Sequence, residues 1–189
     1  MARTRSGTAG PRKAAARRGD AAFRVPPFGR SLAMLLLLSR EAVMQRWRPF
    51  LHARGLTDQQ WRVMRALHEI GSLEIIDLGQ RCCIHPASLS RILPKLAAQG
   101  VISRRHNAAD QRRIIVSLSP AGRRLVEKTV ADGARIYAKL MRDIGQERLD
   151  HLYGHLEELL ARLAGYKPNG RSRPKPHSIQ DGIERLEDC

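Results

Sequence analysis

Apolar and polar residues follow two different periods along the middle of this chain. From residue 31 to residue 99 the apolar residues recur every three or four positions, which predicts helices over 31–53, 57–71, 74–82 and 86–99. Between residues 101 and 118 the period becomes two, which predicts strands over 101–106 and 113–118 joined as a hairpin. Helical spacing returns over 120–143 and 146–163. The pattern predicts a mainly α fold with one small β-hairpin.

Local signals support these helices. Thr57 followed by Gln60 has the spacing of a capping box. Pro86 at the first helical position and Gly100 just past the end bracket the fourth helix. On the second and third helices we expect the inward side chains to be Trp61, Val63, Met64, Leu67, Ile75, Leu78 and Cys82.

The two ends of the chain differ from its middle. Residues 1–30 and 167–189 are rich in Arg, Gly and Pro and contain little from which to build a core. We expect a disordered basic tail over 1–30, a folded domain over 31–166 and a flexible tail over 167–189.

The apolar run over residues 32–38 follows basic residues, as in a signal peptide. It is far shorter than the roughly 20 residues that span a bilayer, and no small-residue cleavage site follows it. We interpret the run as the buried face of a helix. The three cysteines (Cys82, Cys83 and Cys189) make no disulfide framework, which fits a cytoplasmic protein without membrane contact.

Net charge points to a polyanionic partner. The chain holds 34 Lys and Arg against 18 Asp and Glu, a formal charge of +16. Part of the excess lies in residues 3–30, where the one acidic residue is Asp20, and the rest is spread through the folded middle.

The fourth helix has one apolar and one cationic face. Leu89, Ile92, Leu93 and Leu96 lie on one side of a helical wheel. Arg91 and Lys95 lie on the other side, flanked by Ser88 and Ser90. A solvated helix would look the same, but here a short helix and a tight turn precede it, as in a helix-turn-helix. We expect Arg91 to bind a guanine, the serines to contact bases or phosphates, and Lys95 to bind phosphate.

The hairpin that follows is basic enough to be a wing. Arg104, Arg105, His106, Arg112 and Arg113 concentrate positive charge around its tip, where a guanidinium suits a narrow minor groove. Asp110 precedes Arg112 by two residues, and we expect its carboxylate to hold that arginine extended.

These segments resemble the MarR family. The resemblance rests on residues 77–93 (DLGQRCCIHPASLSRIL), 95–105 (KLAAQGVISRR) and 110–122 (DQRRIIVSLSPAG), and it extends over residues 31–163. It implies a winged-helix homodimer with Ser88, Ser90 and Arg91 toward the major groove and Arg112, supported by Asp110, in the minor groove. Two departures are His85-Pro86, where family members usually have Ser or Thr, and Pro94 inside the recognition helix, where we expect a local kink.

A single winged helix reads few base pairs, so we expect a dimer on a pseudo-palindromic site. The leucines over 32–38 and the stripe over 149–163 exceed what a DNA-binding lobe needs. We therefore assign residues 31–54 and 120–164 to dimerisation and residues 56–119 to the DNA-binding lobe. Packing within one chain is the alternative.

Within the family, residues 39–50 and 56–65 resemble the repressors of homoprotocatechuate degradation. The resemblance implies release from DNA by a small aromatic acid of the hydroxyphenylacetate, hydroxycinnamate or hydroxynicotinate type. Such a ligand needs an apolar slot and a cation. We expect Arg40 to bind its carboxylate, with a salt bridge to Glu41 or Glu69 as the alternative. The other expected ligand contacts are Trp61, Met64, Arg65 and His68.

Two other interpretations remain. Cys82 and Cys83 allow a redox-sensing repressor, although a buried structural role for Cys82 is the commoner case. The basic tail alone suits a non-specific architectural DNA-binding protein. No nucleophile elbow, phosphate loop or carboxylate pair indicates an enzyme, and no motif indicates a metal or a cofactor.

Overall fold

A computed structural model describes residues 25–108 and 110–163, and most of both predicted tails lies outside this part of the chain. The chain divides into two compact units, residues 1–39 and 40–189. In the first unit, the described residues form the short helix η1 (Phe28–Arg30) and the beginning of α1 (Leu32–His52). The five leucines at positions 32 and 35–38 are 40–53% exposed, so the expected burial of this run is not achieved within one chain.

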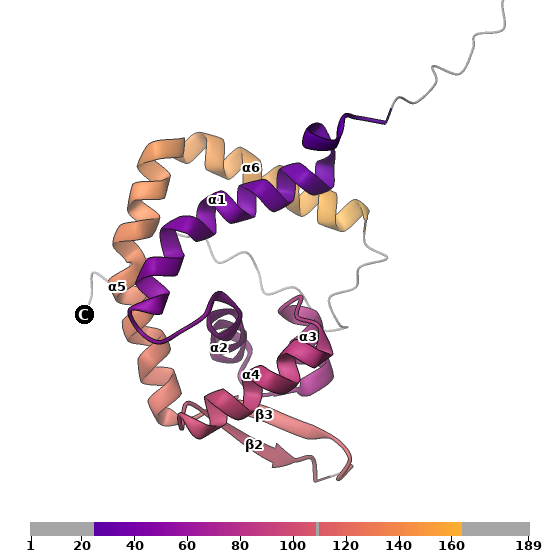
Figure 1. Cartoon of the computed structure of the whole chain (residues 1–189), viewed down its shortest axis with the longest axis vertical. Coiled ribbons are helices and arrows are strands. Elements are labelled where there is room, and N and C mark those ends of the chain that lie inside the picture. The colour runs from indigo at the N-terminus through magenta and orange to yellow at the C-terminus, as the bar shows by residue number, and fades with distance from the viewer. Residues whose placement is uncertain (1–24, 109, 164–189) are drawn as a thin grey trace, which may run out of the picture. The chain divides into compact units, whose positions relative to one another are not determined.

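The second unit contains the remainder of α1 and a winged-helix arrangement (Figure 1). The elements follow in the order α2 (Asp58–Ile70), β1 (Leu73–Glu74), α3 (Ile75–Arg81), α4 (Pro86–Ala98), β2 (Ile102–His106), β3 (Ile114–Leu118), α5 (Pro120–Ile144) and α6 (Gln146–Arg162). The mainly helical fold predicted from the sequence is confirmed, and the predicted ends are close to these bounds.

The sheet has one strand more than the hairpin that the sequence predicts. Its order is β1-β3-β2 with antiparallel pairs, and Leu73 and Glu74 of β1 lie opposite Val116 and Ile115 of β3. A strand of two residues is too short to show an alternating pattern, so the sequence gives no sign of it. The added strand attaches the wing to the start of α3.

The core of the second unit lies between α2, α3, α4 and the sheet. Its most deeply buried side chains include Leu51, Val63, Met64, Leu67, Leu78, Leu89, Leu93, Leu96, Val116 and Val126. Trp61, which we expected to point inward, is half-buried and packs against this core, whereas the polar Gln60 is only 7% exposed. The capping box explains Gln60, because its side chain turns back to accept the backbone N–H of Thr57, 2.9 Å away.

The base of the wing is joined tightly to α5. Ser119 donates its backbone N–H to the carbonyl of Val101 and its hydroxyl to the carbonyl of Gly100, over 3.1 and 2.6 Å. The same hydroxyl accepts the backbone N–H of Gly122 and caps α5. A Cβ at position 122 would lie 1.9 Å from the Val101 carbonyl oxygen, so only glycine allows this approach. The wing and α5 are therefore fixed to each other.

Candidate nucleic-acid interface and ligand site

The turn between α3 and α4 holds the two helices of the predicted helix-turn-helix close together. Cys83 has a positive φ of 48°, which lets the chain reverse direction in a few residues. The ring of His85 accepts the backbone N–H of Ala87 and caps α4. Gly79 is buried, and a Cβ there would lie 3.3 Å from the carbonyl oxygen of Ile84. Larger residues at position 79 would push α4 away from α3.

The cationic face of α4 points away from the core, as the sequence predicts. Arg91 and Lys95 are exposed, and neither forms an ion pair with another residue of the described part of the chain. Ser88 is half-buried, whereas Ser90 is exposed and donates its hydroxyl to the Ala87 carbonyl at 2.9 Å. Both guanidinium and ammonium groups are thus free to meet an anion.

Pro94 does not interrupt the helix that carries these residues. It is exposed, and α4 runs as one helix from Pro86 to Ala98. The missing N–H leaves the Ser90 carbonyl without its helical donor. Positions before Pro94 keep their helical order along the exposed face.

At the wing tip, the side chain of Asp110 holds a different arginine from the one that the sequence predicts. Asp110 accepts the backbone N–H of Arg112 at 3.0 Å, but its side-chain ion pair, at 3.2 Å, is with Arg113. Arg113 also pairs with Glu74 of β1 at 3.3 Å, and this hydrogen bond raises the pKa of the Arg113 guanidinium. Asp110 therefore supports Arg112 through the backbone, and the side chain that it holds is Arg113.

Free positive charge on the wing lies at three other arginines. Arg104, Arg105 and Arg112 are exposed, and none of them has an ion-pair partner among the described residues. Since Arg113 already faces two carboxylates, less of its charge is available to an outside anion.

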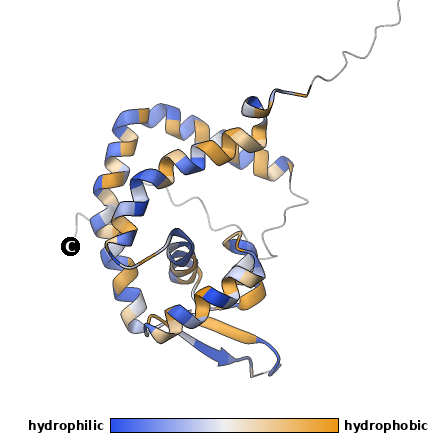
Figure 2. Cartoon of the chain, viewed as in Figure 1, coloured by the Kyte–Doolittle hydropathy of each residue, from blue (hydrophilic) through white to orange (hydrophobic). Residues whose placement is uncertain are grey.

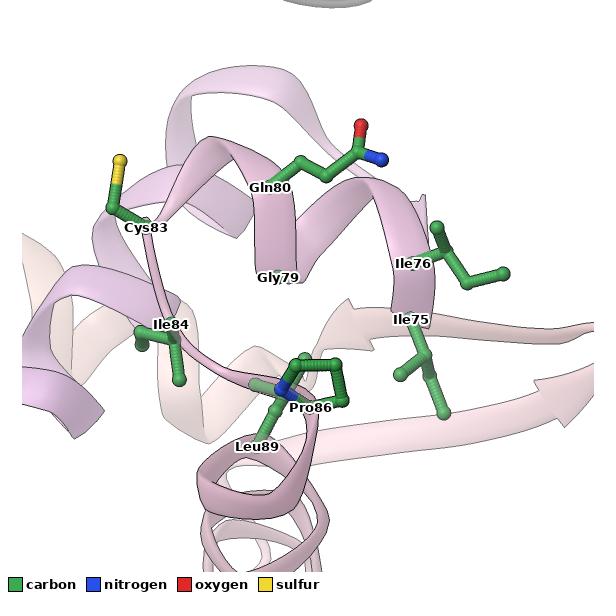
Figure 3. A pocket seen from close by; sticks show the side chains of 8 residues that line it. All are labelled: Ile75, Ile76, Gly79, Gln80, Cys83, Ile84, Pro86 and Leu89. Carbon is green, nitrogen blue, oxygen red and sulfur yellow. The ribbon is translucent and has the colours of Figure 1, made fainter.

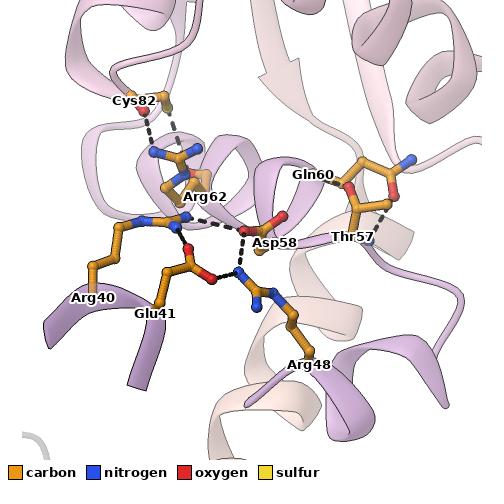
Figure 4. Close-up of polar contacts among 8 residues, drawn as sticks. All are labelled: Arg40, Glu41, Arg48, Thr57, Asp58, Gln60, Arg62 and Cys82. Atoms are coloured by element: carbon orange, nitrogen blue, oxygen red, sulfur yellow. Dashed lines mark hydrogen bonds and ion pairs between the residues drawn. The ribbon is translucent and has the colours of Figure 1, made fainter. Parts of the chain in front are cut away.

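Arg40 lies in a cluster of four alternating charges where α1 meets the start of α2 (Figure 4). Its guanidinium contacts Glu41 at 2.7 Å and Asp58 at 3.0 Å. Arg48 contacts the same two carboxylates at 2.6 and 3.9 Å. The hydrogen bond from Arg48 is the largest cause that lowers the pKa of Glu41. The salt bridge given as the alternative for Arg40 is thus formed in this structure, with Asp58 as an additional partner.

Burial and charge act in opposite directions on Asp58. Burial raises its pKa, but the hydrogen bond from Arg40 and the positive charges of Arg40, Arg48 and Arg62 outweigh burial, so the pKa is lowered. Both carboxylates of the cluster are therefore ionised near neutral pH.

The four predicted ligand residues on α2 separate into two groups. Trp61, Arg65 and His68 are half-buried, and the Arg65 guanidinium lies 6.0 Å from the Trp61 ring centroid. Arg65 pairs with Glu69, and His68 lies 3.6 Å from Glu127 of α5. Met64 is fully buried in the core. Met64 thus lies on the inward side of α2, apart from the other three, and its contact with a ligand stays a prediction.

The adjacent cysteines differ in environment. Cys82 is 5% exposed, and its thiol lies 3.6 Å from the Arg62 carbonyl oxygen. Burial raises the pKa of the Cys82 thiol to about 11, which disfavours the reactive thiolate. Cys83 is exposed. The structure thus supports the buried, structural interpretation of Cys82.

One surface hollow escaped the sequence analysis. It measures about 370 Å³ and lies between α3, the turn and the start of α4 (Figure 3). It contains none of the five residues predicted to bind a ligand. Its lining is mostly apolar and comprises Ile75, Ile76, Gly79, Gln80, Cys83, Ile84, Pro86 and Leu89. Figure 3 shows the Cys83 sulfur directed away from Ile84 and Pro86.

Comparison with known proteins identifies the family of this winged helix. The family model described as "MarR family" matches residues 56–114, from the residue before the capping box to the start of β3. The transcriptional regulator FarR of Neisseria gonorrhoeae is 36% identical over 134 residues, which cover 71% of this chain and 89% of FarR. This chain belongs to the MarR family.

Two further members of the MarR family carry more specific names. The homoprotocatechuate degradative operon repressor of Escherichia coli is 34% identical over 69% of this chain and 88% of its own length. The crystal structure of NadR in complex with 4-hydroxyphenylacetate has a TM-score of 0.63 and 34% identity, over 72% of this chain and 97% of NadR. The chain is therefore a winged-helix transcriptional repressor, and the relatives that it matches are regulators of transcription, not enzymes.

The described residues also bear on membranes and metals. Within 25–108 and 110–163, no helix combines the length and the hydrophobicity needed to cross a bilayer. In the same ranges, no three His, Cys, Asp or Glu side chains gather in a way that suits a metal ion.

Proposed function

We propose that this protein represses genes of aromatic catabolism by binding a pseudo-palindromic duplex site as a homodimer, and that a small aromatic carboxylic acid releases it. The observation that carries the DNA-binding part is a pair of exposed cationic surfaces, one on α4 and one on the wing, whose Arg91, Lys95 and Arg112 have no ion-pair partner within 25–108 and 110–163. They are separate in sequence but belong to one tightly joined winged-helix unit.

In this proposal α4 enters the major groove. Arg91 binds a guanine edge, Ser88 and Ser90 contact bases or phosphates through their oxygens, and Lys95 binds a phosphate. The major groove is about 12 Å wide and admits a helix. The small side chain of Ala87 beside Arg91 leaves room for the backbone to approach.

The wing reaches the minor groove next to it. Arg112 enters the groove, where a narrow A·T-rich segment has an enhanced negative potential. Arg105 contacts the neighbouring phosphates. Asp110 and Arg113 fix the shape of the tip, and Arg113 also makes a weaker contact with the DNA. Arg112 is the wing residue with the largest share of the binding free energy in this proposal.

A competition experiment tests sequence-specific binding. The protein is bound to the promoter fragment upstream of its own gene, and random-sequence duplex is added in hundredfold excess. A sequence-reading repressor stays on the promoter fragment, because specific sites exceed random sites in affinity by about 10³ or more. Complete transfer to the random duplex would instead indicate an architectural protein.

Exposed leucines support the homodimer and the division into dimerisation segments (31–54 and 120–164) and a DNA-binding lobe (56–119). Those at positions 32 and 35–38 of α1 are exposed, and so are Leu152, Leu160 and Leu163, which are 46–64% exposed. Apolar surfaces of this kind mark association sites. We expect sedimentation equilibrium at micromolar concentration to give twice the chain mass of 21.2 kDa. A monomer there would contradict the dimer.

Support for the ligand comes from two relatives and from the charges on α1 and α2. One relative is named as a homoprotocatechuate operon repressor, and NadR was crystallised with 4-hydroxyphenylacetate. In this chain Trp61 offers an aromatic surface, and Arg65 and His68 offer donors beside it. A ligand carboxylate at Arg40 would compete with Glu41 and Asp58 for the guanidinium. A ligand held there would change the spacing between α1 and the DNA-binding lobe, so the DNA-bound form becomes less populated.

Replacement of Arg40 by alanine tests this coupling. We expect operator affinity to change less than threefold, because Arg48 also contacts Glu41 and Asp58 and still joins α1 to the start of α2 in the variant. Release by 4-hydroxyphenylacetate in a gel-shift titration should need at least ten times more ligand. Arg46→Ala is the matched control, since Arg46 also lies on α1 and pairs with Asp143 of α5. Normal release in Arg40→Ala would contradict the role of Arg40.

A further inference from the structure

A row of five cations follows the outer face of α5. Its members, which we call the α5 basic row, are Arg124, Lys128, Arg135, Lys139 and Arg142. At 100° per residue they fall within a sector of about 60°, and they extend over about 27 Å of helix. All five are exposed, and Ala131 and Ala138, which lie on the same side, are exposed as well. Figure 2 shows the corresponding hydrophilic turns along α5.

The opposite face of α5 is the one that the fold uses. Gly122, Val126, Thr129, Gly133 and Leu140 are buried there. Gly133 packs directly against α1, because a Cβ at this position would lie 2.8 Å from the Trp47 ring. The α5 basic row therefore points away from the core of its own chain.

The acidic residues of α5 do not neutralise this row. Glu127, Asp132 and Asp143 each lie three or four residues from a member of the row, close enough for a helical ion pair. Instead, Asp132 pairs with Arg54 at 2.7 Å and Asp143 with Arg46 at 2.6 Å, both on α1. Glu127 faces His68 of α2. Within the described residues, none of the five cations has an ion-pair partner.

We infer that the α5 basic row is a second, sequence-blind binding surface for the phosphate backbone of duplex DNA, separate from the surface that reads the operator. The proposal goes beyond the repressor function, because it gives one operator-bound protein a contact with another DNA segment. Duplex DNA presents closely spaced phosphates along its whole length, and binding to them needs cations alone.

Other partners of a basic helix need features that this face lacks. Insertion into a membrane surface needs an apolar face, and that of α5 is occupied by the core. Single-stranded nucleic acid needs aromatic side chains for stacking. The aromatic residue of α5, Tyr137, is half-buried, and its hydroxyl forms a hydrogen bond with the hydroxyl of Tyr153 on α6. A two-fold contact between two copies of the row would bring like charges together.

A bridging assay tests the inference. One equivalent of protein is bound to an immobilised operator fragment, which occupies the operator-reading surfaces, and a labelled duplex without the operator is added at 50 mM salt. We expect the wild type to retain the second duplex and to lose it steeply with salt, with about 0.9 unit of log–log slope for each phosphate contact. The variant with all five residues changed to glutamine should retain less than a tenth as much.

The matched control removes the same number of charges elsewhere. It carries glutamine at positions 167, 171, 173, 175 and 185, which are Lys and Arg residues of the C-terminal tail. We expect this control to capture the second duplex like the wild type. A triple variant at positions 128, 139 and 142 should show an intermediate loss. The inference would be overturned if the wild type captured no second duplex. It would also be overturned if the five-residue variant captured as much as the wild type, or if the tail control lost as much capture as that variant. Operator binding is measured in every sample, so a failure of operator recognition is distinguished from a failure of the second surface.

Discussion

Replacing Arg91 and Arg112 together by alanine is expected to weaken operator binding roughly 1000-fold while the protein remains folded. A well-placed arginine contact to a base contributes about 1–3 kcal/mol, and a two-fold dimer contains four such side chains. Even at the low end the loss is about 4 kcal/mol, which corresponds to that factor. Fluorescence anisotropy with a labelled promoter fragment at fixed salt gives the dissociation constants.

The expected effects of the single changes differ in kind. Arg91→Ala should relax the base preference within each half-site, because a major-groove arginine distinguishes guanine from the other bases. Arg112→Ala should weaken binding most on sites whose flanking minor groove is narrow. Arg30→Ala is a suitable control, since Arg30 is an exposed arginine that precedes α1. A double variant that binds within threefold of the wild type would remove the basis for placing α4 and the wing on DNA.

Gly122→Ala is expected to destabilise the protein by about 3 kcal/mol or more. The added Cβ would lie 1.9 Å from the Val101 carbonyl oxygen and 2.9 Å from its carbon, and backbone atoms cannot rotate away as a side chain can. Either β2 or the start of α5 must move, which also breaks the bonds that Ser119 makes to both segments. A thermal melt at fixed protein concentration should show a midpoint lower by about 10 °C.

Gly154→Ala is the matched control for that measurement. Gly154 lies in the middle of α6, and a Cβ there would contact nothing within 4 Å. The change should stabilise the protein slightly, by about 0.5–1 kcal/mol, because alanine favours the helix over glycine. Equal melting temperatures for the two variants would show that the junction between the wing and α5 is not tight.

Sequence patterns predicted the DNA-binding lobe well because its elements are local. The helical period places Leu89 and Leu93 in the core and Arg91 outside, and no long-range contact is needed for that result. The contact between Arg113 and Glu74 joins residues 39 positions apart, so nothing in the spacing of the wing reveals it. β1 also escaped detection, because its two residues are too few to show an alternating pattern.

The contacts of Arg40 were harder to predict. The need of an aromatic acid for a cation beside an apolar helix pointed to Arg40, but its partner Asp58 is 18 residues away on another helix, and the sequence alone favoured only Glu41 or Glu69. Met64 and Arg65 are neighbours in sequence, yet one lies in the core and the other at the surface, because successive helical residues point 100° apart. The leucines over 32–38 have the pattern of a buried face but are exposed in the single chain, and the proposed dimer would cover them.

Selection of bound fragments from a random-sequence duplex pool tests whether two copies of α4 and of the wing read duplex DNA together. We expect the recovered sequences to share two inverted half-sites with centres about one helical turn apart, with the outer segments rich in A·T pairs. Recovery of sequences without a shared motif, or with one unrepeated half-site, would contradict it.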